Sequence, residues 1–266
     1  MYSVNYHRAT SVADALQLQG GGGDAKFLSG GMTLIPAMKT RLAAPSDLVD
    51  LAHVPELKGI SVSGRTVRIG AATTHFEVAS DAQLKSVCPA LSDMAAHIGD
   101  PHVRYKGTIG GSIANNDPAA DYPAAMIAMN ATIITDRREV PAADFFTGLF
   151  ETALEDGEIV TAISFTAPDK AGYEKFRNPA SRYAIVGVFV AKDQAGVRVG
   201  VTGAGEEGVF RASALESALA ANFAASALDG ASVPAGQLMS DMHASADYRA
   251  NLIGVMAKRA VTKANG

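Results

Sequence analysis

Two glycine-containing segments, about 80 residues apart, constrain this chain more than any other feature of its sequence. The first runs Leu28-Ser-Gly-Gly-Met-Thr-Leu-Ile-Pro36, and the second runs Lys106-Gly-Thr-Ile-Gly-Gly-Ser-Ile-Ala-Asn-Asn-Asp-Pro118. Glycine lets a backbone approach an oxyanion closely, and backbone N–H groups and hydroxyls such as Thr33, Thr108 and Ser112 can donate to phosphate oxygens. Either glycine pair alone is more typical of a tight turn, but two such segments suit a diphosphate, so a nucleotide-type ligand is one of two open interpretations.

The composition indicates a globular protein. Of 266 residues, 48% are hydrophobic and 19% are charged, and no apolar run approaches the roughly 20 residues that cross a membrane. The net charge of −4 gives no basic surface for nucleic acid. The length fits one or two domains.

Cys88 is the only cysteine in the sequence. The chain therefore cannot form an internal disulfide, and it cannot by itself ligate an iron–sulfur cluster or build a thiolate zinc site. The amino terminus shows no basic flank followed by an apolar core, so we expect a cytoplasmic protein.

The first 55 residues predict a small subdomain. Residues 9–19 are expected to form a helix that begins after Ser11 and is stopped by the glycines at 20–23. The segments 25–28, 34–42 and 48–51 then predict a β-turn-α-β unit, and the subdomain is expected to end near Val54 and Pro55.

Residues 56–168 predict a second subdomain of mixed helices and strands. We expect a hairpin of 60–63 and 66–70, helices at about 75–84, 90–98 and 118–129, a glycine-rich loop at 107–111, and strands at 131–135 and 158–165. After Pro168, a hairpin of 183–191 and 197–202 precedes two helices, at about 211–227 and 245–263. A domain boundary near residue 168 is therefore expected.

The glycine segments also carry a resemblance to a known family. Ser29-Gly-Gly-Met-Thr-Leu-Ile-Pro-Ala-Met-Lys-Thr-Arg41, and Arg104-Tyr-Lys-Gly-Thr-Ile-Gly-Gly-Ser112 followed by Asp117-Pro-Ala-Ala-Asp121, resemble the FAD-binding subunits of molybdenum-containing hydroxylases. Within that family the sequence most resembles the medium subunits of aerobic carbon monoxide dehydrogenases. The similarity extends over the whole chain, through Tyr6-His-Arg8, Gly157-Glu-Ile-Val160, Tyr173-Glu-Lys-Phe176 and Tyr248-Arg-Ala-Asn-Leu252.

The resemblance implies an α+β fold and a set of FAD-binding residues. The implied fold is a PCMH-type FAD-binding domain over residues 1–168, with subdomains of about 1–55 and 56–168, followed by a smaller α+β domain with antiparallel strands over 169–266. Tyr183 is implied to lie beside the isoalloxazine ring. The other implied contacts are Ser29, Gly30, Gly31, Met32, Thr33, Ile98, Thr108, Ile109, Gly110, Gly111, Ser112, Asp121, Val160 and Lys175. Met32 and Ser112 depart from the residues usual in the family, where a small or polar residue and an asparagine are more frequent at these two positions.

The resemblance also implies an electron-transfer function. FAD in this chain would collect electrons from [2Fe–2S] clusters in a small partner subunit, after substrate oxidation at a molybdopterin centre in a large partner, and pass them to a quinone, NAD or oxygen. An (αβγ)2 assembly is implied, and neither a catalytic residue nor a metal ligand is expected here. The alternatives are the flavin subunit of a xanthine dehydrogenase-like or other heterocycle or aldehyde hydroxylase, a stand-alone flavin oxidase, and an assembly protein without FAD.

Three further features have structural interpretations. Gly203-Ala-Gly-Glu-Glu-Gly208 matches a dinucleotide fingerprint, but the strand before it is expected to pair in an antiparallel hairpin, which disfavours NAD binding. The histidines show no metal-binding spacing, and Cys88 is expected to be a small buried side chain. Asp117 and Asp121 are four residues apart and could share one face of a helix.

Overall fold

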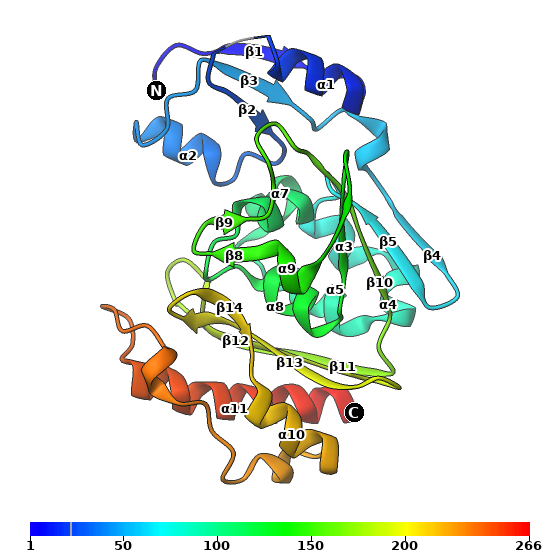
Figure 1. Ribbon diagram of the computed structural model, residues 1–266, viewed down its shortest axis with the longest axis vertical. Coiled ribbons are helices and arrows are strands. Elements are labelled where there is room, and N and C mark those ends of the chain that lie inside the picture. The colour runs from blue at the N-terminus through cyan, green and yellow to red at the C-terminus, as the bar shows by residue number, and fades with distance from the viewer. Residues whose placement is uncertain (22) are drawn as a thin grey trace.

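Three main β-sheets are stacked along the long axis of the molecule (Figure 1). The computed structural model describes residues 1–21 and 23–266. The chain fills the three layers in order, so that the amino-terminal segment and the carboxy-terminal helix lie at opposite ends. The expected α+β class is confirmed.

The upper layer is a parallel sheet of three strands in the order β1-β3-β2. Its elements are β1 (Asn5–Arg8), α1 (Val12–Gln19), β2 (Ala25–Leu28), α2 (Leu34–Lys39) and β3 (Asp47–Asp50), and a 3-10 turn (Pro55–Leu57) follows. The expected β-turn-α-β unit is present as β2, α2 and β3. The Ser11 hydroxyl accepts a hydrogen bond from the Asp14 amide and starts α1, and Gly20 caps its other end. The expected glycine stop also includes Gly22, which lies outside the described residues.

The middle layer is an antiparallel sheet in the order β4-β5-β10-β6-β7, accompanied by helices. Its strands are β4 (Ile60–Ser63), β5 (Thr66–Gly70), β6 (Thr132–Thr135), β7 (Glu139–Pro141) and β10 (Val160–Thr166), and a separate hairpin is formed by β8 (Phe146–Gly148) and β9 (Glu151–Thr152). Its helices are α3 (His75–Ser80), α4 (Ala82–Val87), α5 (Pro89–Ala96), α6 (Pro101–Lys106), α7 (Ile109–Asn115), α8 (Asp121–Ala128) and α9 (Ala142–Phe145).

Two expectations for this layer are wrong. The helix expected over 75–84 is broken at Asp81, which has extended dihedral angles and caps α4 by accepting a hydrogen bond from the Leu84 amide at 2.7 Å. The expected glycine-rich loop is largely the first turn of α7, because the Thr108 side chain caps that helix. A capping residue outweighs the low helix propensity of two glycines here.

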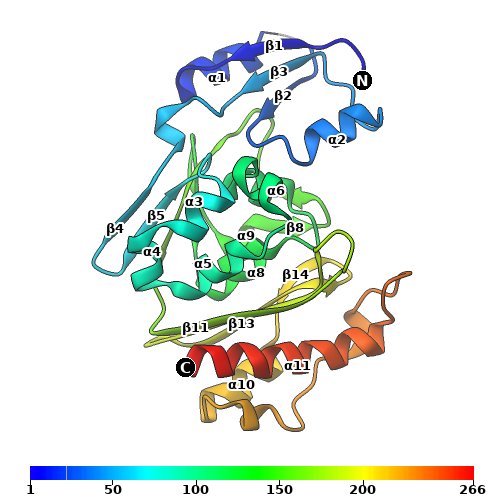
Figure 2. The same cartoon turned by 180° about the vertical axis from the view of Figure 1, so that it is seen from behind.

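The lower layer is the antiparallel sheet β11-β12-β13-β14, and α11 lies along its outer face (Figures 1 and 2). Its elements are β11 (Lys170–Arg177), β12 (Ala184–Asp193), β13 (Gly196–Gly205), β14 (Gly208–Arg211), α10 (Ser213–Ala221) and α11 (Ala246–Asn265), with 3-10 turns at Ala225–Leu228 and Ala235–Gln237. The expected hairpin is β12 and β13. The dinucleotide-like glycines lie at the end of β13 and the start of antiparallel β14, on either side of a two-residue turn, so they do not precede a helix as the fingerprint requires.

The main hydrophobic core crosses the expected boundary at residue 168. That boundary lies between β10 and β11, but Tyr173 and Phe189 of the lower sheet belong to the same buried cluster as Ile163 and Met126 of the middle layer. A second cluster lies between the lower sheet and α11, and a third lies beneath the upper sheet. The lower sheet therefore packs against the middle layer on one face and against α11 on the other. Its side chains can thus contact residues of the middle layer directly.

Candidate cofactor-binding cleft

The two glycine segments lie against each other. The Ser29 and Thr108 hydroxyl oxygens are 2.8 Å apart and share a hydrogen bond across 79 positions of sequence. A Cβ atom added to Gly30 would lie 2.1 Å from the Lys106 carbonyl oxygen and 2.7 Å from the Gly107 Cα. Only glycine lets the backbone at position 30 come this close to the second segment. Gly30 is therefore required for the contact between the two segments.

The two segments offer different groups to a ligand. Within the described residues, the amides of Gly30, Gly31, Met32 and Thr33 donate to no other protein group, and helical bonding begins with the Ile35 amide on the Gly31 carbonyl at 3.1 Å. Gly31 holds a φ of +70° that favours glycine. Successive free N–H groups in such a turn suit an anion.

In the second segment the amides are already used by the protein. The Ile109 amide donates to Thr73, the Gly110 amide donates to Ala71, and the Gly111 amide donates to the Thr108 hydroxyl. The expectation that the amides of both segments are free for phosphate is therefore wrong for these three positions. What this segment presents to a ligand is its hydroxyls and its small side chains.

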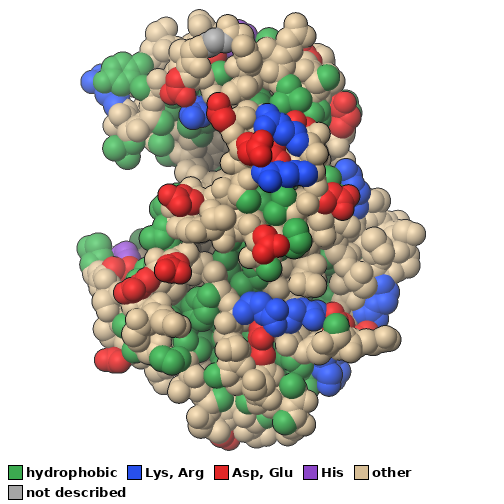
Figure 3. All heavy atoms as spheres, viewed as in Figure 1, with side chains coloured by type: hydrophobic (Ala, Val, Ile, Leu, Met, Phe, Trp, Pro, Cys, Tyr) green, Lys and Arg blue, Asp and Glu red, His purple; other side chains and the backbone are tan. Residues whose placement is uncertain are grey.

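A cleft of about 810 Å³ runs past both segments. One face of the molecule is hollowed between the upper layer and the rest (Figure 3). The volume lies in the usual range of about 300–1,000 Å³ for cofactor and ligand sites. The cleft is lined by residues from all three layers. No single sequence motif contains residues from all of them, so a motif alone could not have predicted the whole lining.

The structure brings most of the candidate residues to this cleft. Ile109 and Lys175 do not line it, since Ile109 is fully buried in the main core and Lys175 lies behind the cleft wall, paired with Asp121. The candidates that line the cleft are Ser29, Gly30, Gly31, Met32, Thr33, Ile98, Thr108, Gly110, Gly111, Ser112, Asp121, Val160 and Tyr183.

Asp121 is held by two residues of the lower sheet. Its carboxylate is 4% exposed, accepts a hydrogen bond from the Tyr173 hydroxyl, and lies 2.9 Å from the Lys175 ammonium nitrogen. Burial, followed by the charge of Asp121, raises the pKa of Tyr173 well above its usual value. The cleft wall thus contains a buried carboxylate whose charge is compensated from β11.

Asp117 and Tyr183 lie beside this ion pair at the edge of the cleft. Asp117 precedes α8, so it does not share a helical face with Asp121 as the spacing allowed. Burial raises the pKa of Asp117, and burial with the charges of Asp117 and Asp121 raises the pKa of Tyr183. Tyr183 is 44% exposed, which leaves its ring accessible from the cleft.

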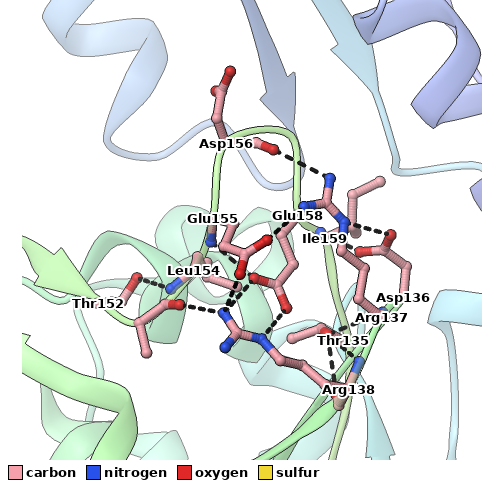
Figure 4. Close-up of polar contacts among 11 residues, drawn as sticks. Thr135, Asp136, Arg137, Arg138, Thr152, Leu154, Glu155, Asp156, Glu158 and Ile159 are labelled. Atoms are coloured by element: carbon pink, nitrogen blue, oxygen red, sulfur yellow. Dashed lines mark hydrogen bonds and ion pairs between the residues drawn. The ribbon is translucent and has the colours of Figure 1, made fainter.

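A polar network fixes another stretch of the wall, the turn from Leu154 to Val160 (Figure 4). Arg138 makes two hydrogen bonds, of 3.0 and 2.9 Å, to the Glu158 carboxylate, whose side chain is fully buried. Glu158 also accepts the Glu155 amide at 2.8 Å, and Asp136 accepts the Ile159 amide at 2.7 Å. The hydrogen bond from Arg138 lowers the pKa of Glu158 to about 2.

This network predicts an acid-sensitive contribution to stability. The pKa of Glu158 falls from 4.5 to about 2 on folding, so its contribution is present above about pH 4.5 and is lost as the pH falls toward 2. We expect Glu158→Gln to lower the free energy of unfolding by about 2–3 kcal/mol at neutral pH, with the difference from the unsubstituted chain shrinking below about pH 4.5. Urea unfolding over this pH range measures it, and exposed Glu139 on β7, changed to Gln, is the control. A difference that does not depend on pH would contradict the assignment.

Among the cleft-lining residues that sequence reasoning did not select, His75 and Glu158 carry titratable side chains that the wall buries. Glu158 belongs to the segment Gly157-Glu-Ile-Val160 that carries part of the resemblance, and this signal could have found it. Nothing in the local pattern marks His75, whose place in the cleft depends on packing against Gly107. Burial lowers the pKa of His75 to about 4, so the imidazole is neutral near pH 7.

Other chemistry-bearing residues are explained by the fold. Cys88 is buried at the junction of α4 and α5, and burial raises the pKa of its thiol to about 11, so it is not an activated nucleophile. Within residues 1–21 and 23–266, no cluster of His, Cys, Asp and Glu is arranged to hold a metal ion. Over the same residues, no helix has both the length and the apolar character to cross a membrane.

The fold and the cleft together define a protein that binds a nucleotide-type cofactor, and comparisons with known proteins identify the family. A family model described as the FAD binding domain in molybdopterin dehydrogenase matches residues 2–168. The carbon monoxide dehydrogenase medium chain of Afipia carboxidovorans is 37% identical, over 98% of this chain and 96% of that protein. The nicotine 6-hydroxylase medium subunit of Paenarthrobacter nicotinovorans is 30% identical, over 98% and 97%. A solved structure of reconstituted CO dehydrogenase from Oligotropha carboxidovorans matches with a TM-score of 0.89 and 35% identity, over 99% of this chain and 98% of that chain.

The chain therefore belongs to the family of FAD-binding domains of molybdopterin dehydrogenases, as an FAD-binding subunit of a molybdenum hydroxylase. The expected resemblance is confirmed, and with it the assignments of FAD and of an oxidoreductase. The cleft fits this cofactor, because free amides at Gly30–Thr33 suit a diphosphate and the volume suits a large ligand.

Proposed function

We propose that FAD in this cleft receives electrons from [2Fe–2S] clusters of a small partner subunit and passes them to an external acceptor, which would be a quinone, NAD or oxygen. The substrate would be oxidised at a molybdopterin centre in a large partner, within an (αβγ)2 assembly. Two observations support this division of tasks. The matching relatives are named as medium chains or subunits, and Cys88, the only cysteine of the sequence, is too few for a cluster that requires several ligands.

In this proposal the chain's own residues bind and orient the cofactor. The amides of Gly30 to Thr33 and the hydroxyls of Ser112 and Thr33 would hold the diphosphate, and Tyr183 would lie beside the isoalloxazine ring. When bound, FAD supplies the redox chemistry, and the protein supplies position and electrostatics. No general acid or base is assigned to this chain.

The observation that carries the proposal is the contact between the two glycine segments at one cleft. Segments 79 positions apart share the hydrogen bond between Ser29 and Thr108, and the Gly30 backbone packs on Lys106 and Gly107. We further propose carbon monoxide as the first substrate to test for the complex, because the relative at 37% identity is a carbon monoxide dehydrogenase chain. A heterocycle is the alternative, because a nicotine 6-hydroxylase subunit also matches almost full length.

Isolation from the native host tests this function. The chain would be tagged at one end and purified gently, and flavin, iron, molybdenum and the accompanying polypeptides would be measured in one sample. We expect FAD together with iron, molybdenum, one larger and one smaller polypeptide, and bleaching of the flavin by the substrate of the large subunit. FAD on a solitary chain that a small molecule reduces directly would replace the proposal with a stand-alone oxidase, and a chain without flavin would indicate an assembly protein.

A further inference from the structure

His75 is a buried histidine whose ring makes no hydrogen bond within the described part of the chain. The residue is 5% exposed and lines the cleft, and its Nδ1 atom is fully buried without a partner. Of the other histidines, His7 is 2.7 Å from the Asp47 carboxylate and His97 is 2.7 Å from the Asp93 carbonyl oxygen, while the His102 side chain is 97% exposed. Among the histidines, only His75 is buried and has a ring that forms no hydrogen bond with a described residue.

The imidazole is held firmly where it lies. His75 is the first residue of α3, which begins with a reciprocal capping pair between Thr74 and Glu77. The His75 amide donates to the Gly107 carbonyl oxygen at 2.9 Å, and a Cβ added to Gly107 would lie 2.6 Å from the His75 Nε2 atom. The ring is therefore packed against the start of the second glycine segment, and the missing side chain at Gly107 makes room for it.

The protein groups that the structure describes around the His75 ring form no hydrogen bond with it. The Tyr122 ring is tilted at 41° with its centroid 5.4 Å away, which is an aromatic contact. The Arg104 guanidinium donates to the carbonyl oxygens of Ile98 and Gly99 at 3.0 Å each. A buried polar group without a hydrogen bond is destabilising, and such a group in a native protein calls for a partner: an ordered water, an ion or a ligand.

We propose that Nε2 of the His75 imidazole, the ring nitrogen beside Gly107, donates a hydrogen bond to an oxygen of FAD, on the diphosphate or on the ribityl chain. Nδ1 has no accessible surface and therefore cannot reach the cofactor. This inference rests on the proposed function, since it needs FAD in the cleft. A neutral imidazole carries one N–H donor and can satisfy one cofactor oxygen without adding charge. His75 would thus join the binding residues that the resemblance supplied.

The test compares affinity for ligand with stability of the ligand-free chain. The full-length chain is stripped of flavin and titrated with FAD and, separately, with ADP, using the unsubstituted chain, His75→Phe and His75→Gln, with His102→Phe as the matched control. We expect His75→Phe to bind FAD about tenfold more weakly, which corresponds to one hydrogen bond. His75→Gln should recover most of the affinity, because its amide can donate, and His102→Phe should bind normally. Without ligand, His75→Phe should be at least as stable as the unsubstituted chain, because it removes an unsatisfied polar group from the interior.

Each outcome has a defined meaning. Weaker binding of both ADP and FAD by His75→Phe places the bond on the diphosphate, and weaker binding of FAD alone places it on the ribityl chain. Unchanged FAD affinity in His75→Phe overturns the inference, as does a loss of affinity that follows a loss of ligand-free stability and that glutamine does not restore. If His75→Phe does not fold, the imidazole ¹⁵N shifts of the unsubstituted chain decide, and shifts that FAD leaves unchanged overturn the inference. Failure of the unsubstituted chain to bind FAD contradicts the proposed function instead.

Discussion

Gly30→Ala is expected to abolish retention of FAD. The added methyl group would lie 2.1 Å from the Lys106 carbonyl oxygen and 2.7 Å from the Gly107 Cα, and both are backbone atoms that no rotamer change can move away. The two glycine segments must therefore separate, which breaks the hydrogen bond between Ser29 and Thr108 and displaces the free amides of the first segment. We expect bound flavin per chain to fall at least about tenfold, together with an overpacking cost of about 1–3 kcal/mol in unfolding free energy.

Flavin absorbance after gel filtration, together with urea unfolding, measures both effects. Gly254→Ala in α11 is the matched control, because a Cβ there meets no atom within 4 Å. Alanine in the interior of a helix should raise stability by up to about 1 kcal/mol and should leave flavin content unchanged. Full flavin occupancy in Gly30→Ala would show that the contact between the segments is not needed for binding.

The parts of the fold that the sequence predicted are those with a strong local signal. The hairpin of β4 and β5 alternates apolar and polar residues about a glycine turn, and the structure has it at the expected bounds. The expected hairpin of β12 and β13 also forms, although its strands extend to Asp193 and Gly205 and are buried on both faces. Local chemistry decides such elements, so they can be recognised before any tertiary contact is known.

The parts that failed depend on contacts between distant segments. Strand β11 was not expected, because its polar residues gave no alternation, and it is fixed by pairing with β12. Packing within the protein also requires the glycine at Gly110, because a Cβ there would lie 2.4 Å from the Ala71 Cβ, and the glycine motif alone does not show this second role. Sequence motifs located the cleft, and the resemblance at residues 157–160 could also have marked Glu158. The wall at His75, in contrast, is set by packing against Gly107, which a linear pattern does not encode.

Lys175→Met is expected to cause the largest loss of stability. Lys175 on β11 and Asp121 at the start of α8 form a buried ion pair, with side-chain exposures of 5% and 4% and a distance of 2.9 Å. Methionine preserves the size of the side chain but leaves the Asp121 carboxylate buried without its counter-charge. Breaking such a pair from one side costs about 3–5 kcal/mol, and urea unfolding at neutral pH measures it. Lys258→Met is the control, because its pair with Asp229 is solvent-exposed and should contribute less than about 1 kcal/mol.

A double variant separates the structural role of this pair from its role in binding FAD. Asp121→Asn together with Lys175→Met removes both charges, so most of the lost stability should return. If the double variant is stable but binds FAD weakly, the charges serve the cofactor, and the lower sheet supplies one of them, Lys175, from beyond residue 168. If it is stable and binds FAD normally, the pair only joins the two layers, and the assignment of Asp121 and Lys175 as cofactor contacts is wrong. A Lys175→Met loss no larger than that of Lys258→Met would show that the ion pair is not buried in solution.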